Sequence, residues 1–118
     1  MNIILWIAQG ILSALFMMGG VMKSFQPKEK LAKSMPWVND FSSPVVKLIG
    51  MAELLGAVAL IVPMLLGIAP VLTPLAATGL GITMILAAVY HYRKHEMKAI
   101  VMNTVLFSLA AFVALGRF

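Results

Sequence analysis

The sequence contains no cysteine, and only 11% of its 118 residues are charged. Without cysteine the chain forms no disulfide, performs no thiol redox chemistry and holds no iron–sulfur cluster or haem through a thiolate. Charged residues make up about a quarter of an ordinary water-soluble domain. This chain therefore has too few charges to cover a surface that faces water, which excludes the classes of water-soluble enzyme.

Apolar residues are abundant instead: 62% of the chain is hydrophobic, with a mean hydropathy of +1.01. Each long apolar segment is close to the roughly 20 residues that a helix needs to cross a bilayer. The segments are residues 3–22, 45–62, 68–90 and 99–115. None of them alternates apolar and polar residues as the strand of a membrane barrel does. The sequence therefore predicts an all-α, integral membrane four-helix bundle, with residues 1–118 as a single domain.

The first segment does not resemble a cleaved signal peptide. No basic residue precedes it, and no small-residue cleavage site follows it at residues 17–20. We expect it to remain in the mature protein as the first membrane span.

The basic residues are distributed unevenly between the two sides of this bundle. Of nine Lys and Arg residues, all but Arg117 fall in the connections 23–43 and 91–98 or at Lys47. The positive-inside rule then predicts that both connections lie in the cytoplasm and both chain termini outside. Anionic lipid head groups are a simpler partner for this charge than nucleic acid.

Residues 27–35, between the first two spans, form a short amphipathic segment. Leu31 and Met35 are four residues apart and share one helical face, with lysines around them. Trp37 and Phe41 are of the type that prefers the head-group boundary. We interpret the segment as an interfacial lipid anchor, with a docking surface for a partner protein as the alternative.

Glu53 is the most informative polar residue, because it lies eight positions beyond Val45 in the second apolar segment. At 1.5 Å per residue this is about 12 Å into the bilayer. An acid exposed to lipid there costs on the order of 3 kcal/mol or more, so we expect Glu53 to face the bundle interior. The candidates for a shared polar cluster in this half of the bundle are Lys23, Thr83, His91 and Asn103. Two interpretations stay open: a network that sets helix register, or a site for a ligand head group or a proton.

Close packing must supply much of the helix association, since lipid tails are as apolar as leucine. Small residues four apart allow backbones to approach, and each apolar segment has one such pair. The pairs are Gly10/Ala14, Ala52/Gly56, Ala77/Gly81 and Ala110/Ala114. The glycines expected at helix contacts are Gly20, Gly50, Gly56 and Gly81. Gln9 and Ser13, also four apart, predict polar contacts between helices.

We expect no metal site. His91 and His95 have the i, i+4 spacing that places two imidazoles on one helix face. However, they lie where the third span should end, and the basic residues nearby oppose a cation.

The order of these features resembles the DoxX-like family over nearly the whole chain. The resemblance is carried by residues 20–23 (Gly-Val-Met-Lys), residues 49–56 (Ile-Gly-Met-Ala-Glu-Leu-Leu-Gly), residues 70–77, the helix end at His91 and Asn103. It implies a small four-helix protein of the bacterial cytoplasmic membrane, with Lys23, Glu53 and Gly56 at family positions. The family name comes from a subunit of a thiosulfate:quinone oxidoreductase. The resemblance extends distantly to the assembly chaperone for nicotinic receptors, which implies that the scaffold also serves a non-catalytic role.

Three functions follow as hypotheses. The first is a non-catalytic accessory or assembly factor for other membrane proteins. The second is a quinone-linked oxidoreductase subunit that binds its ligand near Glu53, quinone being the one cofactor considered. The third is a small proton-coupled transporter acting as an oligomer. A homodimer is compatible with all three, and a self-sufficient enzyme is not expected because the chain has no thiol and no credible haem-ligand pair.

The charge distribution makes a topology prediction. A periplasmic reporter such as alkaline phosphatase, fused after Phe118, should be active in cells, because the positive-inside rule places the C-terminus outside. The same reporter fused within connection 91–98 should be inactive. A fluorescent reporter at the C-terminus that matures in the cytoplasm would contradict the predicted orientation.

Overall fold

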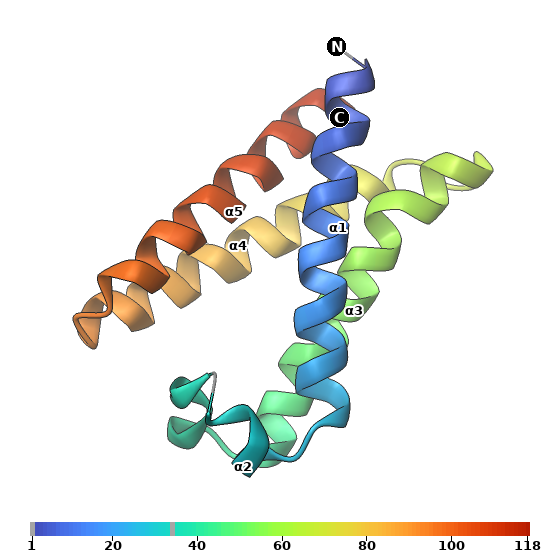
Figure 1. The fold of residues 1–118 in the computed structure, drawn as a ribbon. Coiled ribbons are helices and arrows are strands. Elements are labelled where there is room, and N and C mark those ends of the chain that lie inside the picture. Colours follow the sequence, from blue (N-terminus) through green and yellow to red (C-terminus); the bar gives the residue numbers. More distant parts are fainter. Residues whose placement is uncertain (1, 34) are drawn as a thin grey trace.

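The structure, a computed structural model, describes residues 2–33 and 35–118. In chain order, its elements are α1 (Asn2–Phe25), α2 (Lys28–Leu31), the 3-10 helix η1 (Pro36–Asp40), α3 (Ser43–Leu66), α4 (Leu72–Arg93) and α5 (Met97–Arg117) (Figure 1). Four helices in this described part are long and apolar enough to span a membrane, and it contains no strand. The predicted all-α, multi-pass membrane architecture is confirmed.

The second span is longer than predicted, because α3 continues through Pro63 to Leu66 and ends at Gly67 with a left-handed φ of 69°. A proline within a helix removes one N–H and leaves the carbonyl four residues earlier without its helical donor. That carbonyl belongs to Ala59, and the hydroxyl of Thr73 on α4 donates to it at 3.0 Å. The predicted end of this span at residue 62 is therefore wrong, since a hydrogen bond from another helix replaces the missing one.

The bounds of the last two spans also differ from the prediction. Pro70 lies in the turn before α4, and Pro74 alone occupies the first turn of that helix. α4 continues to Arg93, and α5 includes Gly116 instead of ending before it. A helix satisfies its backbone groups internally, so in a bilayer it tends to continue until water or another chain segment takes over.

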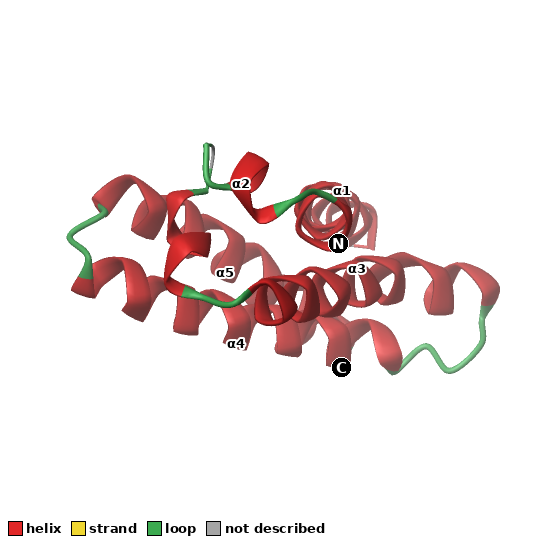
Figure 2. Cartoon of the chain, turned by 90° about the horizontal axis from the view of Figure 1, so that it is seen from below, coloured by secondary structure: helices red, strands yellow, loops and turns green. Residues whose placement is uncertain are grey.

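The four long helices form two pairs. α1 packs along α3 and α4 along α5, whereas the two pairs meet over a smaller area, chiefly between α3 and α4. Figure 1 shows the α4–α5 pair tilted away from the α1–α3 pair toward the end that carries α2. Both termini lie together at the opposite end, where the Arg117 guanidinium donates to the Asn2 side chain at 2.7 Å. Short loops connect α3 to α4 and α4 to α5, whereas α2 and η1 lie between α1 and α3 (Figure 2).

Gly20 and Gly50 lie at the closest approach of α1 and α3. A Cβ atom on Gly20 would be 2.8 Å from the Gly50 carbonyl oxygen, and one on Gly50 would be 2.6 Å from the Lys23 Cβ atom. Gly56 and Gly81 also face neighbouring helices, at the side chains of Leu80 and of Ala110 and Phe107 respectively. All four glycines expected at helix contacts thus have a neighbouring helix beside them.

The pair Gly10/Ala14 is predicted to pack and does not. A Cβ atom added to Gly10 would have no neighbouring atom within 4 Å, and Ala14 is exposed. The buried positions of α1 include Ala8, Leu12 and Phe16, which lie on the other side of the helix. Small residues four apart permit close packing, but the larger apolar residues decide which face turns inward.

Polar contacts join the helices near the end that holds the termini. The Gln9 amide donates to the Leu60 carbonyl at 2.6 Å, and the Ser13 hydroxyl to the Ala57 carbonyl at 2.7 Å. Gln9 in turn accepts a hydrogen bond of 2.7 Å from Arg117. These bonds confirm the expected helix–helix contacts of Gln9 and Ser13.

The amphipathic segment between α1 and α3 packs onto the protein. Leu31 is 1% exposed and lies in a small cluster with Val38 of η1 and Val46 of α3. Met35 packs against the same cluster. The apolar side of this segment is therefore covered by its own chain, and α2 is shorter than the predicted 27–35.

Because α1 and α3 approach so closely, a side chain added at their contact should lower the stability of the protein. Gly50→Ala should lower the free energy of unfolding by about 1–3 kcal/mol, because backbone atoms of α1 occupy the place of the new methyl group. Gly79→Ala on α4 is the matched control: nothing lies within 4 Å of its Cβ position, and alanine favours a helix over glycine by about 1 kcal/mol. Thermal unfolding in detergent measures both. Equal melting temperatures for the two variants would contradict the close approach.

Candidate functional site

A cavity of about 670 Å³ lies where the two helix pairs diverge. Residues of α1, η1, α3, α4 and α5 form its walls, and most of them are apolar. The polar or aromatic residues of the lining are Lys23, Trp37, Phe41, Glu53, Thr83, Tyr90, His91 and Asn103. A largely apolar cavity with a few polar groups is the usual form of a small-molecule site.

Glu53 and Lys23 form an ion pair at one side of the cavity. The Lys23 Nζ atom lies 2.5 Å from Glu53 Oε1. The side chain of Lys23 is 13% exposed and that of Glu53 is 6% exposed. Lys23 Nζ also lies 5.3 Å from the centre of the Trp37 ring, within range of a cation–π interaction. A lysine at this helix end is able to extend toward the head groups or to turn inward, and here the carboxylate and the indole hold it inward.

Gly19 of α1 lies beside the ion pair, where a Cβ atom would make ordinary van der Waals contact with the two side chains. A Cβ atom at this position would be 3.5 Å from Glu53 Oε2 and 4.0 Å from Lys23 Nζ. The pair is thus enclosed between α1 and α3, where two opposite charges compensate each other. Burying a charge in this way is tolerated only while its partner remains in place.

Asn103 supplies the one polar side chain of α5 in the lining. The residue is 8% exposed, and its Nδ2 atom is buried without a hydrogen-bond partner. A buried amide donor that makes no bond costs about 1–3 kcal/mol. Native structures rarely leave such a group unpaired, and a water molecule or a ligand would satisfy this donor.

Thr83 and His91 line the same cavity but have other partners. The Thr83 hydroxyl donates to the Gly79 carbonyl of its own helix at 3.0 Å. His91 Nδ1 lies 3.1 Å from Glu96 Oε1 in the turn after α4. The five residues predicted as a polar cluster therefore surround one space, and among them Lys23 and Glu53 are in direct contact with each other.

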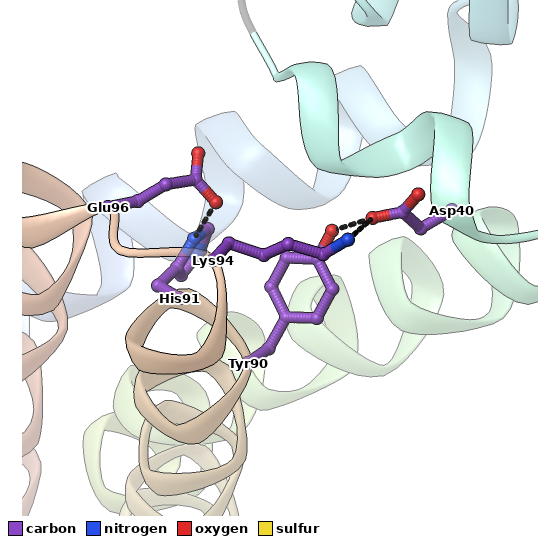
Figure 3. A network of polar contacts seen from close by, with 5 residues as sticks. All are labelled: Asp40, Tyr90, His91, Lys94 and Glu96. Atoms are coloured by element: carbon purple, nitrogen blue, oxygen red, sulfur yellow. Dashed lines mark hydrogen bonds and ion pairs between the residues drawn. The ribbon is translucent and has the colours of Figure 1, made fainter.

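Beside the cavity, η1 and α4 make contacts that the sequence did not reveal. The Tyr90 hydroxyl on α4 donates to the carboxylate of Asp40 in η1, and Lys94 Nζ lies 3.4 Å from the same carboxylate (Figure 3). The Phe41 ring is 5.7 Å from the Tyr90 ring and also 5.7 Å from Trp37. The hydrogen bond from Tyr90, together with the charge of Lys94, holds the pKa of Asp40 below its ordinary value. These contacts join η1 to α4 across the opening between the helix pairs.

The aromatic residues of η1 and its flank are the part of the site that sequence analysis missed. The sequence places Trp37 and Phe41 at the head-group boundary, and in the structure both line the cavity. Asp40 and Tyr90 are fifty residues apart, and no spacing rule links an acid in a loop to a tyrosine at a helix end. The sequence did show aromatic residues near the membrane interface. Such residues contact either lipid head groups or the wall of a cavity, and the sequence does not say which.

Residues 2–33 and 35–118 include no group of three or more side chains arranged to hold a metal ion. His95 lies beyond the end of α4, exposed and with a φ of 59°. The i, i+4 spacing of His91 and His95 therefore does not place their rings on one helix face.

Comparison with known proteins gives a single result. The family model described as the DoxX-like family matches residues 7–113. No curated protein and no solved structure matches the chain.

The ion pair predicts unequal effects of removing its two members. Lys23→Met should destabilise the protein by about 3 kcal/mol, because it leaves a buried carboxylate without its partner. Glu53→Gln should cost less, since the long lysine side chain is able to turn out to the head groups. The double variant Lys23→Met/Glu53→Gln should recover much of the loss. Thermal unfolding in detergent is the measurement, with Lys98→Met at an exposed position as control. Additive effects of the two single changes would contradict the pairing.

Proposed function

The chain belongs to the DoxX-like family, and from this premise we propose that it is an accessory membrane subunit that binds a neutral lipophilic ligand of the quinone type. The ligand occupies the cavity beside Glu53, with its head group toward Asn103. The protein contributes binding and orientation, and a partner complex supplies the electron-carrying chemistry. The basic end of the bundle, which includes α2 and the α4–α5 turn, faces the cytoplasm.

The observation that carries this proposal is the unpaired Nδ2 donor of Asn103. The atom is buried, and its residue lines the cavity of about 670 Å³, whose walls are mainly apolar. A ligand carbonyl placed there would accept the missing hydrogen bond, and an apolar ring and tail would fit the walls. The recovered bond favours a ligand with a carbonyl over a purely hydrocarbon one.

The charges of the site support a neutral head group. Lys23 and Glu53 compensate each other at 2.5 Å, so the pair offers no unbalanced charge to a carboxylate or an amine. Either ionic head group would have to compete with an existing partner and lose its own hydration. A neutral acceptor has neither cost, which favours a quinone over a fatty acid or a cationic amphiphile.

A second candidate is the assembly factor for other membrane proteins. It is supported by α5, the least buried of the four spans. In its most apolar part 17% of the residues are buried, against 28–33% for the other spans. This helix leaves the largest lateral surface for a partner helix or a second copy of the chain. In this case the cavity and its polar groups serve the stability of the bundle.

The proposal predicts a retained ligand that depends on Asn103. Mass spectrometry of molecules extracted from gently purified wild-type protein should find a quinone at near one per chain. Asn103→Leu should lower retention about tenfold, the effect of losing one good hydrogen bond. Thr104→Val is the matched control: Thr104 is exposed and its hydroxyl bonds the Ile100 carbonyl of its own helix.

The alternatives give different results. Bulk phospholipid alone, equal in wild type and variants, would reject the ligand and favour the assembly factor. Crosslinking in native membranes would then be expected to capture a partner through α5, and its failure to do so would reject that role as well.

A further inference from the structure

A second cavity, of about 360 Å³, lies where α1 ends and α3 begins, beside α2. Lys23 belongs to the walls of both cavities, and the other lining residues differ. The proposed ligand does not use this second space. The second cavity is therefore free to bind a different molecule.

Lysines from three helices meet in this cavity. Lys23 comes from α1, Lys28 from α2 and Lys47 from α3. Glu53 compensates the charge of Lys23, which leaves Lys28 and Lys47 against the single acid in the lining, Glu29. The cavity therefore has a net positive charge, unlike the first one.

The start of α3 adds to this field. The helix has 24 residues and begins at Ser43, which lines the cavity. Its N-cap residue, Ser42, makes no side-chain capping bond to the first-turn amides. The N–H groups at a helix start carry a positive partial charge and favour an anion. Lysines and helix amides thus act in the same direction.

The position of the cavity favours an anion that also has an apolar part. It lies at the ends of two membrane-length helices, on the side where the basic residues gather. Apolar side chains also line it, including Phe25, which is 75% exposed, and the buried Val46. A group bound here would meet cations at one side and an apolar surface at the other.

We propose that this second cavity binds the phosphate group of an anionic phospholipid, held by Lys28 and Lys47, with the acyl chains lying along the exposed surface near Phe25. The phosphate oxygens would accept charge-assisted hydrogen bonds from the two ammonium groups. Inorganic phosphate has the same anionic oxygens but no chains for the apolar wall.

The chain offers a matched control for this site. Lys30 and Lys33 belong to the same connection, are exposed and do not line the cavity. Lys28→Gln/Lys47→Gln and Lys30→Gln/Lys33→Gln therefore remove equal charge from the same side of the protein. Diffuse attraction to a negative surface would suffer equally from either double variant.

The experiment is a titration of the full chain in neutral detergent, followed by native mass spectrometry. Phosphatidylglycerol should bind at one per chain and about tenfold tighter than phosphatidylcholine with the same acyl chains. Lys28→Gln/Lys47→Gln should lose about tenfold in affinity for phosphatidylglycerol, while Lys30→Gln/Lys33→Gln stays within about twofold of wild type. Lys28→Arg/Lys47→Arg should keep binding, and Glu29→Gln should strengthen it.

Three results would overturn the proposal. Equal losses in both Gln double variants would mean diffuse surface attraction. Unchanged affinity in Lys28→Gln/Lys47→Gln, with its helicity preserved by circular dichroism, would place the lipid elsewhere. Binding of inorganic phosphate that requires the two lysines, without any preference for phosphatidylglycerol, would make this a free-anion site and reject the lipid. Retention of ligand in the first cavity should be the same in all these variants, which separates this test from that of the proposed function.

Discussion

The backbone contact between α1 and α3 at Gly20 and Gly50 is the constraint on which the rest of the site depends. Because neither residue has a side chain, the two helices approach until the Gly50 carbonyl oxygen lies only 2.8 Å from where a Cβ atom of Gly20 would be. This approach places the end of α1 directly beside the middle of α3. Lys23 is then opposite Glu53, thirty residues later in the chain, at 2.5 Å. A wider separation would leave a carboxylate in the membrane without a partner, at a cost of several kcal/mol.

The second consequence is the divergence of the helix pairs. α1 and α3 approach each other at Gly20 and Gly50, and Gly81 of α4 faces the side chain of Ala110 on α5. Each pair is therefore closely packed internally, and the space between them at the α2 end is closed by larger aromatic groups. Trp37, Phe41 and Tyr90 reach across it, and the hydrogen bond of Tyr90 to Asp40 joins the connection to α4. A tightly closed bundle would have had no room for a cavity of about 670 Å³.

The sequence predicts the parts of this arrangement that follow from transfer energies. Four apolar segments have the length of a bilayer, and an acid as deep as Glu53 is too costly to face lipid. The sequence does not decide questions that depend on where a second element lies. The side chain of Lys23 is able to turn inward or outward. The helix continues through Pro63 because Thr73 of another helix donates a hydrogen bond to the Ala59 carbonyl. Asp40 and Tyr90 come into contact only in the folded chain. Gly10 and Ala14 have the four-residue spacing of small residues that permits close helix packing, but they lie on the outward face of α1 and, among the described residues, pack against no other helix.

Lys23 lines both cavities, so the direction of its side chain affects the charge of each. Its ammonium group is held toward Glu53 and Trp37, so the first cavity remains neutral and the second depends on Lys28 and Lys47 for its charge. If Lys23 instead extended toward the head groups, the first cavity would contain an uncompensated carboxylate and the second a third free cation. The first cavity would then disfavour the proposed neutral ligand, and the second would gain affinity for an anion. The inward position of one lysine thus separates the largely apolar first cavity, proposed for a neutral ligand, from the basic second cavity, proposed for a lipid phosphate.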